Sequence, residues 1–90
     1  MALYRKKPVD VEAVQWTGDN AEDVWRFADK CFYPEHFLEY PRCVAGIYDE
    51  LHGTWIRVKL GDWVLKGVRG EFYPCDEGVF AETYELVCDG

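Results

Sequence analysis

The stretch that decides the fold is residues 54–75, TWIRVKLGDWVLKGVRGEFYPC, in which alternating apolar and polar residues are separated by glycine-containing dipeptides. Alternation with a period of two is typical of β-strands that bury one face. Gly61-Asp62 and Arg69-Gly70 are suited to tight turns, so we expect an antiparallel meander. Its three strands are predicted over residues 54–60, 63–68 and 71–75.

The two turns fix a register for this meander. If each turn is a two-residue loop, Arg57 lies opposite Lys66, and Lys66 in turn lies opposite Tyr73. One face of the three strands then carries apolar side chains and is predicted to belong to the core. These side chains are Ile56, Val58, Leu60, Trp63, Leu65 and Phe72.

The opposite face of the meander collects the candidate ligand-binding residues Trp55, Arg57, Lys59, Lys66 and Tyr73. Arg and Lys bind phosphate or carboxylate groups, and Trp or Tyr stacks on planar rings. Like charges on opposite strands are mildly destabilising, and their grouping in an acidic protein is the composition of a surface for an anionic or planar ligand. The alternative is a solvated or packed face, since Lys and Arg also protect sheets from aggregation and cover aromatic rings.

The N-terminal half is predicted to contribute one strand and the main helix. Residues 8–16, PVDVEAVQW, alternate between small apolar and acidic residues, which predicts a strand. Residues 21–32 carry an apolar stripe that includes Val24 and Ala28, so an amphipathic helix is expected to pack on the sheet. Residues 33–42 contain two prolines and are expected to be mainly loop.

The remaining segments complete the predicted fold. Strands are expected over residues 43–48 and 85–88, and Asp76 is placed to cap a short helix over residues 77–84. The order β-α-β-β-β-β-α-β predicts an α+β domain with a mostly antiparallel sheet or small open barrel, packed by one main amphipathic helix. With 49% hydrophobic and 17% aromatic residues, the chain is expected to form a single domain over residues 1–90.

Charge and hydropathy narrow the classes of partner. The chain has 17 acidic and 10 basic residues and a net charge of −7, whereas nucleic-acid-binding domains carry a basic excess, so nucleic acid is not an expected partner. No apolar run approaches the roughly 20 residues of a membrane-spanning helix. The N-terminal residues MALYRKKPVDVEA lack the apolar segment of a signal peptide. We therefore expect a cytoplasmic protein that does not bind membranes.

Neither the cysteines nor the carboxylates form a recognisable reactive set. The cysteines, at positions 31, 43, 75 and 88, have no C-x-x-C spacing and no histidine at zinc-finger spacing. We expect structural thiols, with a zinc site or a disulfide as alternatives. Cys75 precedes the predicted cap of a helix, a position that can lower a thiol pKa, but no base adjoins it in the sequence. No cofactor, metal site or catalytic residue is predicted, and we do not expect an enzyme.

Two blocks, PVDVEAVQWTGDN at residues 8–20 and GDWVLKGVRGEFYPCDEGVFAETYE at residues 61–85, resemble a family of small uncharacterised bacteriophage and prophage proteins. The second block also resembles a short domain named for a PGDYG motif, in which a Gly-Asp-aromatic turn precedes a Gly-Glu-aromatic strand and an F-x-x-x-Y ending. Phe80 and Tyr84 form that ending here, and Leu60 replaces the proline that often precedes the turn. The resemblance implies a phage-encoded protein in the bacterial cytoplasm, without assigned catalytic residues.

These features favour a non-enzymatic binding or interaction module of phage origin. Its partner would be a host or phage protein, or a second copy of the chain bound through sheet edges or exposed aromatic residues. The first alternative is a small-molecule binder that sequesters an anionic, nucleotide-like ligand on the basic and aromatic face of residues 54–75. The second alternative is an enzyme, for which no nucleophile and base can be paired from the sequence.

Overall fold

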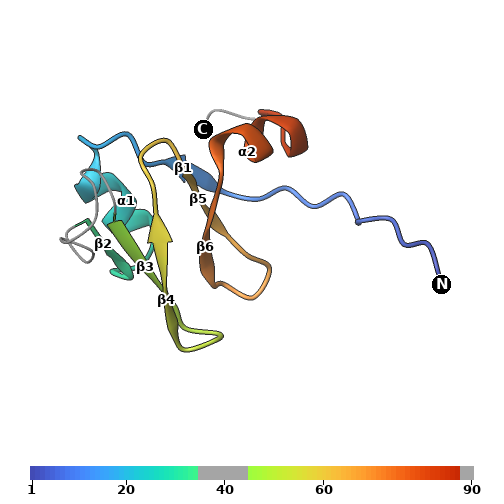
Figure 1. The fold of residues 1–90 in the computed structure, drawn as a ribbon, viewed down its shortest axis with the longest axis horizontal. Helices are drawn as coiled ribbons and strands as arrows, with labels where there is room; N and C mark the ends of the chain where they lie inside the picture. The colour runs from blue at the N-terminus through green and yellow to red at the C-terminus, as the bar shows by residue number, and fades with distance from the viewer. Residues whose placement is uncertain (35–44, 88–90) are drawn as a thin grey trace.

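The computed structural model describes residues 1–34 and 45–87, which form two helices and two small antiparallel sheets (Figure 1). In chain order the elements are β1 (Ala13–Gln15), α1 (Ala21–Phe27), β2 (Phe32–Tyr33), β3 (Ala45–Asp49), β4 (Thr54–Val58), β5 (Trp63–Lys66), β6 (Phe72–Cys75) and α2 (Glu77–Thr83). The predicted α+β class is confirmed, and the described strands do not close into a barrel. Neither α1 nor α2 is long and apolar enough to cross a bilayer.

The strands are divided between two three-stranded sheets of order β1-β5-β6 and β2-β3-β4. Figure 1 shows the two sheets adjoining each other, with β6 beside β3 and β4. The hydrophobic core lies where the sheets and α1 meet. It comprises Trp16, Val24, Ala28, Cys31, Phe32, Ala45, Ile47, Val58, Val64 and Phe72.

The link from β4 to β5 overturns the predicted register of the meander. β4 pairs with β3, whereas β5 pairs with β1 and β6, so the predicted pairing of Arg57 with Lys66 is wrong. Gly61 and Asp62 form a turn, as predicted, but both bond through their backbones to Trp16. β1 therefore lies beside β5, where β4 was predicted. The turn at Gly61 and Asp62 connects β4 in one sheet to β5 in the other.

The hairpin of β5 and β6 is present, but its register differs from the prediction by one residue. Lys66 lies opposite Phe72 rather than Tyr73. The loop comprises residues 68–70, and Gly70 has a φ of +83°, as is usual at the end of a three-residue hairpin loop. Because side chains alternate along a strand, this single residue puts Lys66 and Tyr73 on opposite faces of the sheet.

Helix α1 is shorter than the predicted helix over residues 21–32. The Lys30 N–H donates to the Trp25 carbonyl at 3.0 Å, the long closing bond of a Schellman motif. Asp29 and Lys30 both have positive φ, at +50° and +69°, which turns the chain away from the helix axis. Phe32 then enters β2 and is completely buried. The apolar residues at the end of the predicted helix therefore serve a strand.

The outermost predicted strands are shorter or missing. The first comprises only Ala13–Gln15. The Lys66 N–H still bonds to the Glu12 carbonyl, but β5 ends at Lys66 and leaves residues 8–11 without a neighbouring strand in the described part of the chain. Residues 85–87 form no strand, and Leu86 is 80% exposed. Cys88 lies outside the described residues. So do residues 43 and 44 of the predicted strand over 43–48, and residues 35–42 of the predicted loop.

Candidate functional site

The structure distributes the five candidate residues over both sheets. Trp55 and Arg57 lie on β4, Lys59 lies just after it, Lys66 lies on β5 and Tyr73 lies on β6. Since β4 belongs to the other sheet, and Lys66 and Tyr73 point to opposite faces, the five residues do not form the predicted common face. Trp55 and Arg57, two residues apart, share a face of one strand.

Lys59 and Tyr73 contribute to the packing of α2. Lys59 Nζ lies 3.5 Å from Oδ1 of Asp76, the residue that caps α2 by accepting hydrogen bonds from the N–H groups of Gly78 and Val79. Burial raises the pKa of the Tyr73 hydroxyl, and the neighbouring Tyr84 raises it further. These two side chains are therefore engaged in the fold.

A different set of side chains gathers on the outer face of the β2-β3-β4 sheet. Tyr48 lies directly opposite Trp55. Tyr33 on β2 and Arg57 on β4 both lie opposite Gly46 of the central strand. Their neighbours along each strand point to the core, because side chains alternate between faces. We call Tyr33, Tyr48, Trp55 and Arg57 the aromatic face.

The three rings of the aromatic face form one continuous cluster. The Trp55 ring packs edge-to-face on Tyr33 and on Tyr48, with centroid separations of 5.2 Å in both cases. Gly46 adds no side chain between the rings, which leaves room for this contact. Edge-to-face packing is favourable, so the rings fix one another although Tyr33 is 46% and Trp55 36% exposed.

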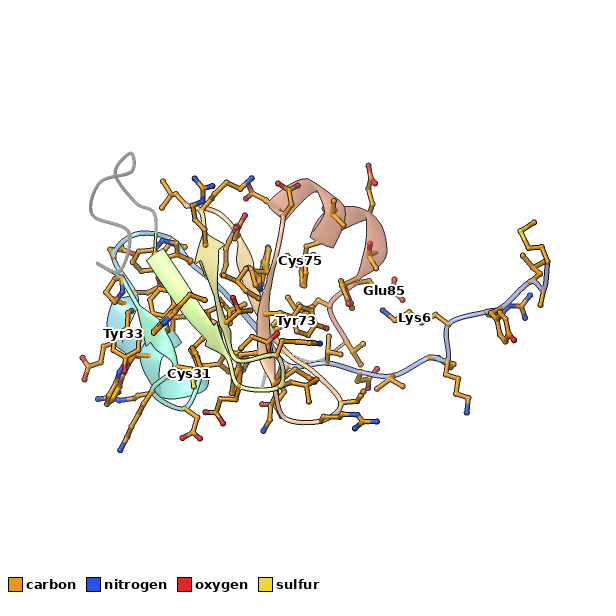
Figure 2. All side chains as sticks on the ribbon, turned by 60° about the horizontal axis from the view of Figure 1, so that its bottom comes forward. Lys6, Cys31, Tyr33, Tyr73, Cys75 and Glu85 are labelled. Carbon is orange, nitrogen blue, oxygen red and sulfur yellow. The ribbon has the colours of Figure 1, made fainter. Side chains whose placement is uncertain are left out.

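An open groove of about 400 Å³ lies beside these rings. The three rings line it together with Asp29, Lys30, Cys31 and Glu50. Figure 2 shows Cys31 and Tyr33 on the same side of the molecule, away from Tyr73 and Cys75. The left-handed turn after α1 places Asp29 and Lys30 at the groove. Counting only lining residues that the structure describes, two carboxylates against one ammonium group give the rim an acidic balance.

The thiols of the described cysteines are not activated as nucleophiles. Cys31 Sγ donates to Glu50 Oε1 at 3.1 Å. Burial, together with the bond to Glu50 and its charge, raises the pKa of Cys31 to about 11, so this thiol stays protonated at neutral pH. Burial also raises the pKa of Cys75, although that residue lies next to the α2 cap. Both are free thiols, and Cys43 and Cys88 lie outside the described residues.

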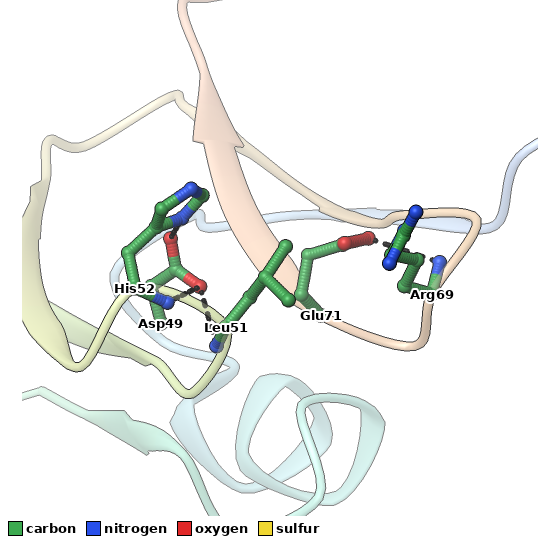
Figure 3. Close-up of polar contacts among 5 residues, drawn as sticks. All are labelled: Asp49, Leu51, His52, Arg69 and Glu71. Carbon is green, nitrogen blue, oxygen red and sulfur yellow. Dashed lines mark hydrogen bonds and ion pairs between the residues drawn. The ribbon is translucent and has the colours of Figure 1, made fainter.

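An aspartate–histidine pair lies in the turn between β3 and β4 (Figure 3). His52 Nδ1 is 2.7 Å from Asp49 Oδ2, and Asp49 Oδ1 accepts from the N–H groups of Leu51 and His52 at 3.0 and 3.3 Å. The bond from His52 is the main cause that lowers the pKa of the Asp49 carboxyl. No bond in the described part of the chain joins this pair to a nucleophile, so its evident role is to hold the turn.

The described residues also contain no group of three or more His, Cys, Asp or Glu side chains placed to hold a metal ion. No protein-family model, curated protein or solved structure matches the chain. The resemblance to phage proteins therefore stays a prediction based on its two sequence blocks.

Sequence reasoning missed two members of the aromatic face, Tyr33 and Tyr48. Tyr33 falls in the stretch predicted to be loop, and nothing local identifies a two-residue strand. A signal existed for Tyr48, because Ala45 and Ile47 are apolar residues two positions apart within the predicted strand over residues 43–48. Alternation alone would have placed Tyr48 on the outer face.

Proposed function

We propose that this protein is a non-enzymatic binding module that contacts another protein through the aromatic face. The observation that carries the proposal is that Tyr33 and Trp55 stay 46% and 36% exposed while packed in a fixed cluster. Trp, Tyr and Arg dominate the binding energy of protein interfaces, and the aromatic face consists of these three residue types. A cluster that is already ordered also loses little side-chain entropy on binding.

The acidic rim of the groove supports a partner that presents a basic side chain. Asp29 and Glu50 lie beside the rings. A lysine or arginine over the Trp55 ring would gain a cation–π interaction and a nearby carboxylate. The proposal includes a phage origin for the protein, because two blocks of its sequence resemble phage proteins. Its partner would then be a host or phage protein in the bacterial cytoplasm.

The alternative functions have weaker support. An anionic, nucleotide-like ligand in the groove would face two carboxylates, and the basic residues predicted to hold it are dispersed. An enzyme with a cysteine nucleophile would need an activated thiol, whereas Cys31 and Cys75, the two cysteines in the described part of the chain, both have raised pKa values.

Affinity capture from bacterial extracts with a matched pair of tryptophan variants tests the proposal. Trp55→Ala removes the central ring of the aromatic face, and Trp25→Ala is the control because Trp25, on α1, is 38% exposed. A specific partner should be retained by the wild type and by Trp25→Ala, and lost by Trp55→Ala. Equal retention by all three proteins, or no specific partner for any of them, would contradict the proposal.

A melting assay with mono-, di- and cyclic nucleotides distinguishes the main alternative. The proposed protein-binding role predicts no stabilisation by any member of the panel. A stabilisation that Arg57→Ala abolishes would instead support the small-molecule function.

A further inference from the structure

The N-terminal arm, residues 1–11, has little contact with the rest of the described fold. Figure 1 shows it leaving β1 and running away from both sheets. Leu3 and Tyr4 are 100% and 90% exposed. Lys6 Nζ lies 3.4 Å from the Tyr84 hydroxyl and 5.2 Å above its ring centre, an exposed contact. An extended arm with exposed apolar residues indicates a surface that a further molecule covers.

The part of the arm that adjoins β1 has the sequence pattern of a strand but no strand beside it. Residues 8–12 alternate between apolar and polar side chains, yet β5 ends at Lys66 and the chain turns away over residues 68–70. Among the strands of residues 1–34 and 45–87, the order β1-β5-β6 places β1 at an edge of its sheet. Unpaired backbone groups at such an edge are available to a strand from another chain.

The backbone direction along this edge can be assigned residue by residue. The Glu12 carbonyl accepts from the Lys66 N–H at 3.0 Å, so the backbone groups of Glu12 point toward β5. Because these groups alternate along an extended strand, those of Ala13 point to the open edge, and those of Val9 and Val11 would do the same if the extended conformation of β1 continues through residues 8–12. The open edge therefore offers a regular row of donors and acceptors.

Pro8 does not interrupt this row. Proline lacks an N–H and usually blocks strand pairing on the side to which its nitrogen points. Pro8 lies four positions before Glu12, so in an extended strand its nitrogen points to the β5 side, as the backbone groups of Glu12 do, rather than to the open edge. The position of the proline is compatible with a further strand.

The charges of the segment are complementary to a second copy of itself. Three of the ten basic residues and none of the seventeen acidic residues lie within residues 1–9, and Asp10 and Glu12 follow directly. When two copies pair antiparallel about an axis at Pro8, the basic end of each lies beside the acidic end of the other. Opposite charges on paired strands are favourable.

We propose that the chain self-associates through the open edge of β1, with residues 3–13 of two copies paired antiparallel about a two-fold axis at Pro8. The two β1-β5-β6 sheets then form one continuous sheet of six strands. Odd-numbered residues supply the hydrogen bonds on both sides, and with Pro8 on the axis Lys6 of each copy lies opposite Asp10 of the other. This interface goes beyond the proposed function, because the aromatic face belongs to the other sheet.

A pair of charge-swapped variants tests this geometry by sedimentation equilibrium. Lys6→Glu and Asp10→Lys change exposed side chains, so each variant should remain folded. Each variant alone places like charges together and should dissociate at least about tenfold more readily than the wild type. An equimolar mixture restores opposite charges and should form heterodimers with close to wild-type affinity. Loss of association in the variants without recovery in the mixture would overturn the proposal.

A backbone substitution tests the same edge independently of charge. Val9→Pro removes an N–H from the open edge and should abolish the dimer, whereas Val9→Thr keeps the N–H and the β-branched shape and should retain it. A wild-type protein that stays monomeric throughout the accessible concentration range would overturn the proposal. So would a dimer that tolerates Val9→Pro but is lost in Trp55→Ala, because that result would locate the interface on the aromatic face.

Discussion

The two sheets of this small domain use their aromatic residues in opposite ways. In the β1-β5-β6 sheet, Trp63 stacks on Phe80 of α2 with centroids 4.2 Å apart, and Phe80 stacks on Tyr84. In the β2-β3-β4 sheet, Tyr33 and Trp55 contact each other and remain exposed. The same residue types therefore hold a helix in place on one sheet and form a partly exposed face on the other. We infer that only the second set is available to a partner.

The largest expected effect is on the stability of the covered sheet. Trp63→Ala removes the stacking surface for α2 and should lower the free energy of unfolding by about 2–3 kcal/mol, less than for a fully buried tryptophan. Urea denaturation measures the change. If Trp63→Ala were no more destabilising than Trp55→Ala, the distinction between aromatic residues that pack on α2 and aromatic residues on a partly exposed face would be wrong.

The next effect concerns the turn that carries the chain from one sheet to the other. Gly61 has a φ of +93°, which an L-residue adopts only with strain, so Gly61→Ala should cost about 1–2 kcal/mol in thermal or urea unfolding. Gly78→Ala is the control, because Gly78 lies in α2 without a positive φ. An equal loss of stability for both variants would contradict the proposed role of the turn.

Asp62, in this turn, and Asp49, in the turn between β3 and β4, should make the free energy of unfolding depend on pH in opposite directions. Burial raises the pKa of Asp62 above its ordinary 3.8, so the stability it contributes is present below that value and is lost as pH rises through the folded-state pKa. Hydrogen bonds lower the pKa of Asp49, so its contribution is present above 3.8 and is lost as pH falls through the folded-state pKa.

Asparagine substitutions at Asp62 and Asp49 allow the two opposite pH dependences to be measured. Asp62→Asn keeps an oxygen that accepts from the Lys59 N–H and should stabilise the protein at neutral pH, with the gain vanishing in acid. Asp49→Asn should destabilise it at neutral pH and have little effect in acid. Urea unfolding of both variants at neutral pH and at about pH 3 measures these changes. If both variants changed the free energy of unfolding in the same direction at neutral pH, the opposite pKa shifts of Asp62 and Asp49 would be contradicted.

Features that depend on neighbouring residues could be predicted from the sequence. Asp76 caps α2 as expected, and Phe80 and Tyr84 stack at 5.0 Å one helical turn apart. The partners of β5 could not be predicted, because residues 8–16 and 54–60 have the same alternating pattern and either could pair with it. The outcome depends on long-range packing, in which Trp16 bonds to the backbone of Gly61 and Asp62.

The candidate site was only partly predictable for the same reason. Trp55 and Arg57 lie together because they are two residues apart on one strand. Lys66 and Tyr73 were separated by one additional loop residue, since a shift of one position reverses the face of every side chain. Tyr48 and Tyr33 join the site through strand pairings that no local pattern specifies.

The smallest expected effect is the stability change of Trp55→Ala. Trp55 is 36% exposed, so its removal should lower the free energy of unfolding by only about 1 kcal/mol in urea denaturation. A loss of several kcal/mol would show that the aromatic face is a structural element of the fold.

The indole N–H signals of the four tryptophans test the central claim most directly. Trp16 is 3% exposed in the core, Trp25 lies on α1, Trp55 on the aromatic face and Trp63 beneath α2. In a ¹⁵N-correlation spectrum recorded with the captured partner, the Trp55 signal should shift or broaden while those of Trp16 and Trp63 stay in place. An unchanged Trp55 signal alongside a shifted Trp25 or Trp63 signal would contradict the claim that the aromatic face binds the partner.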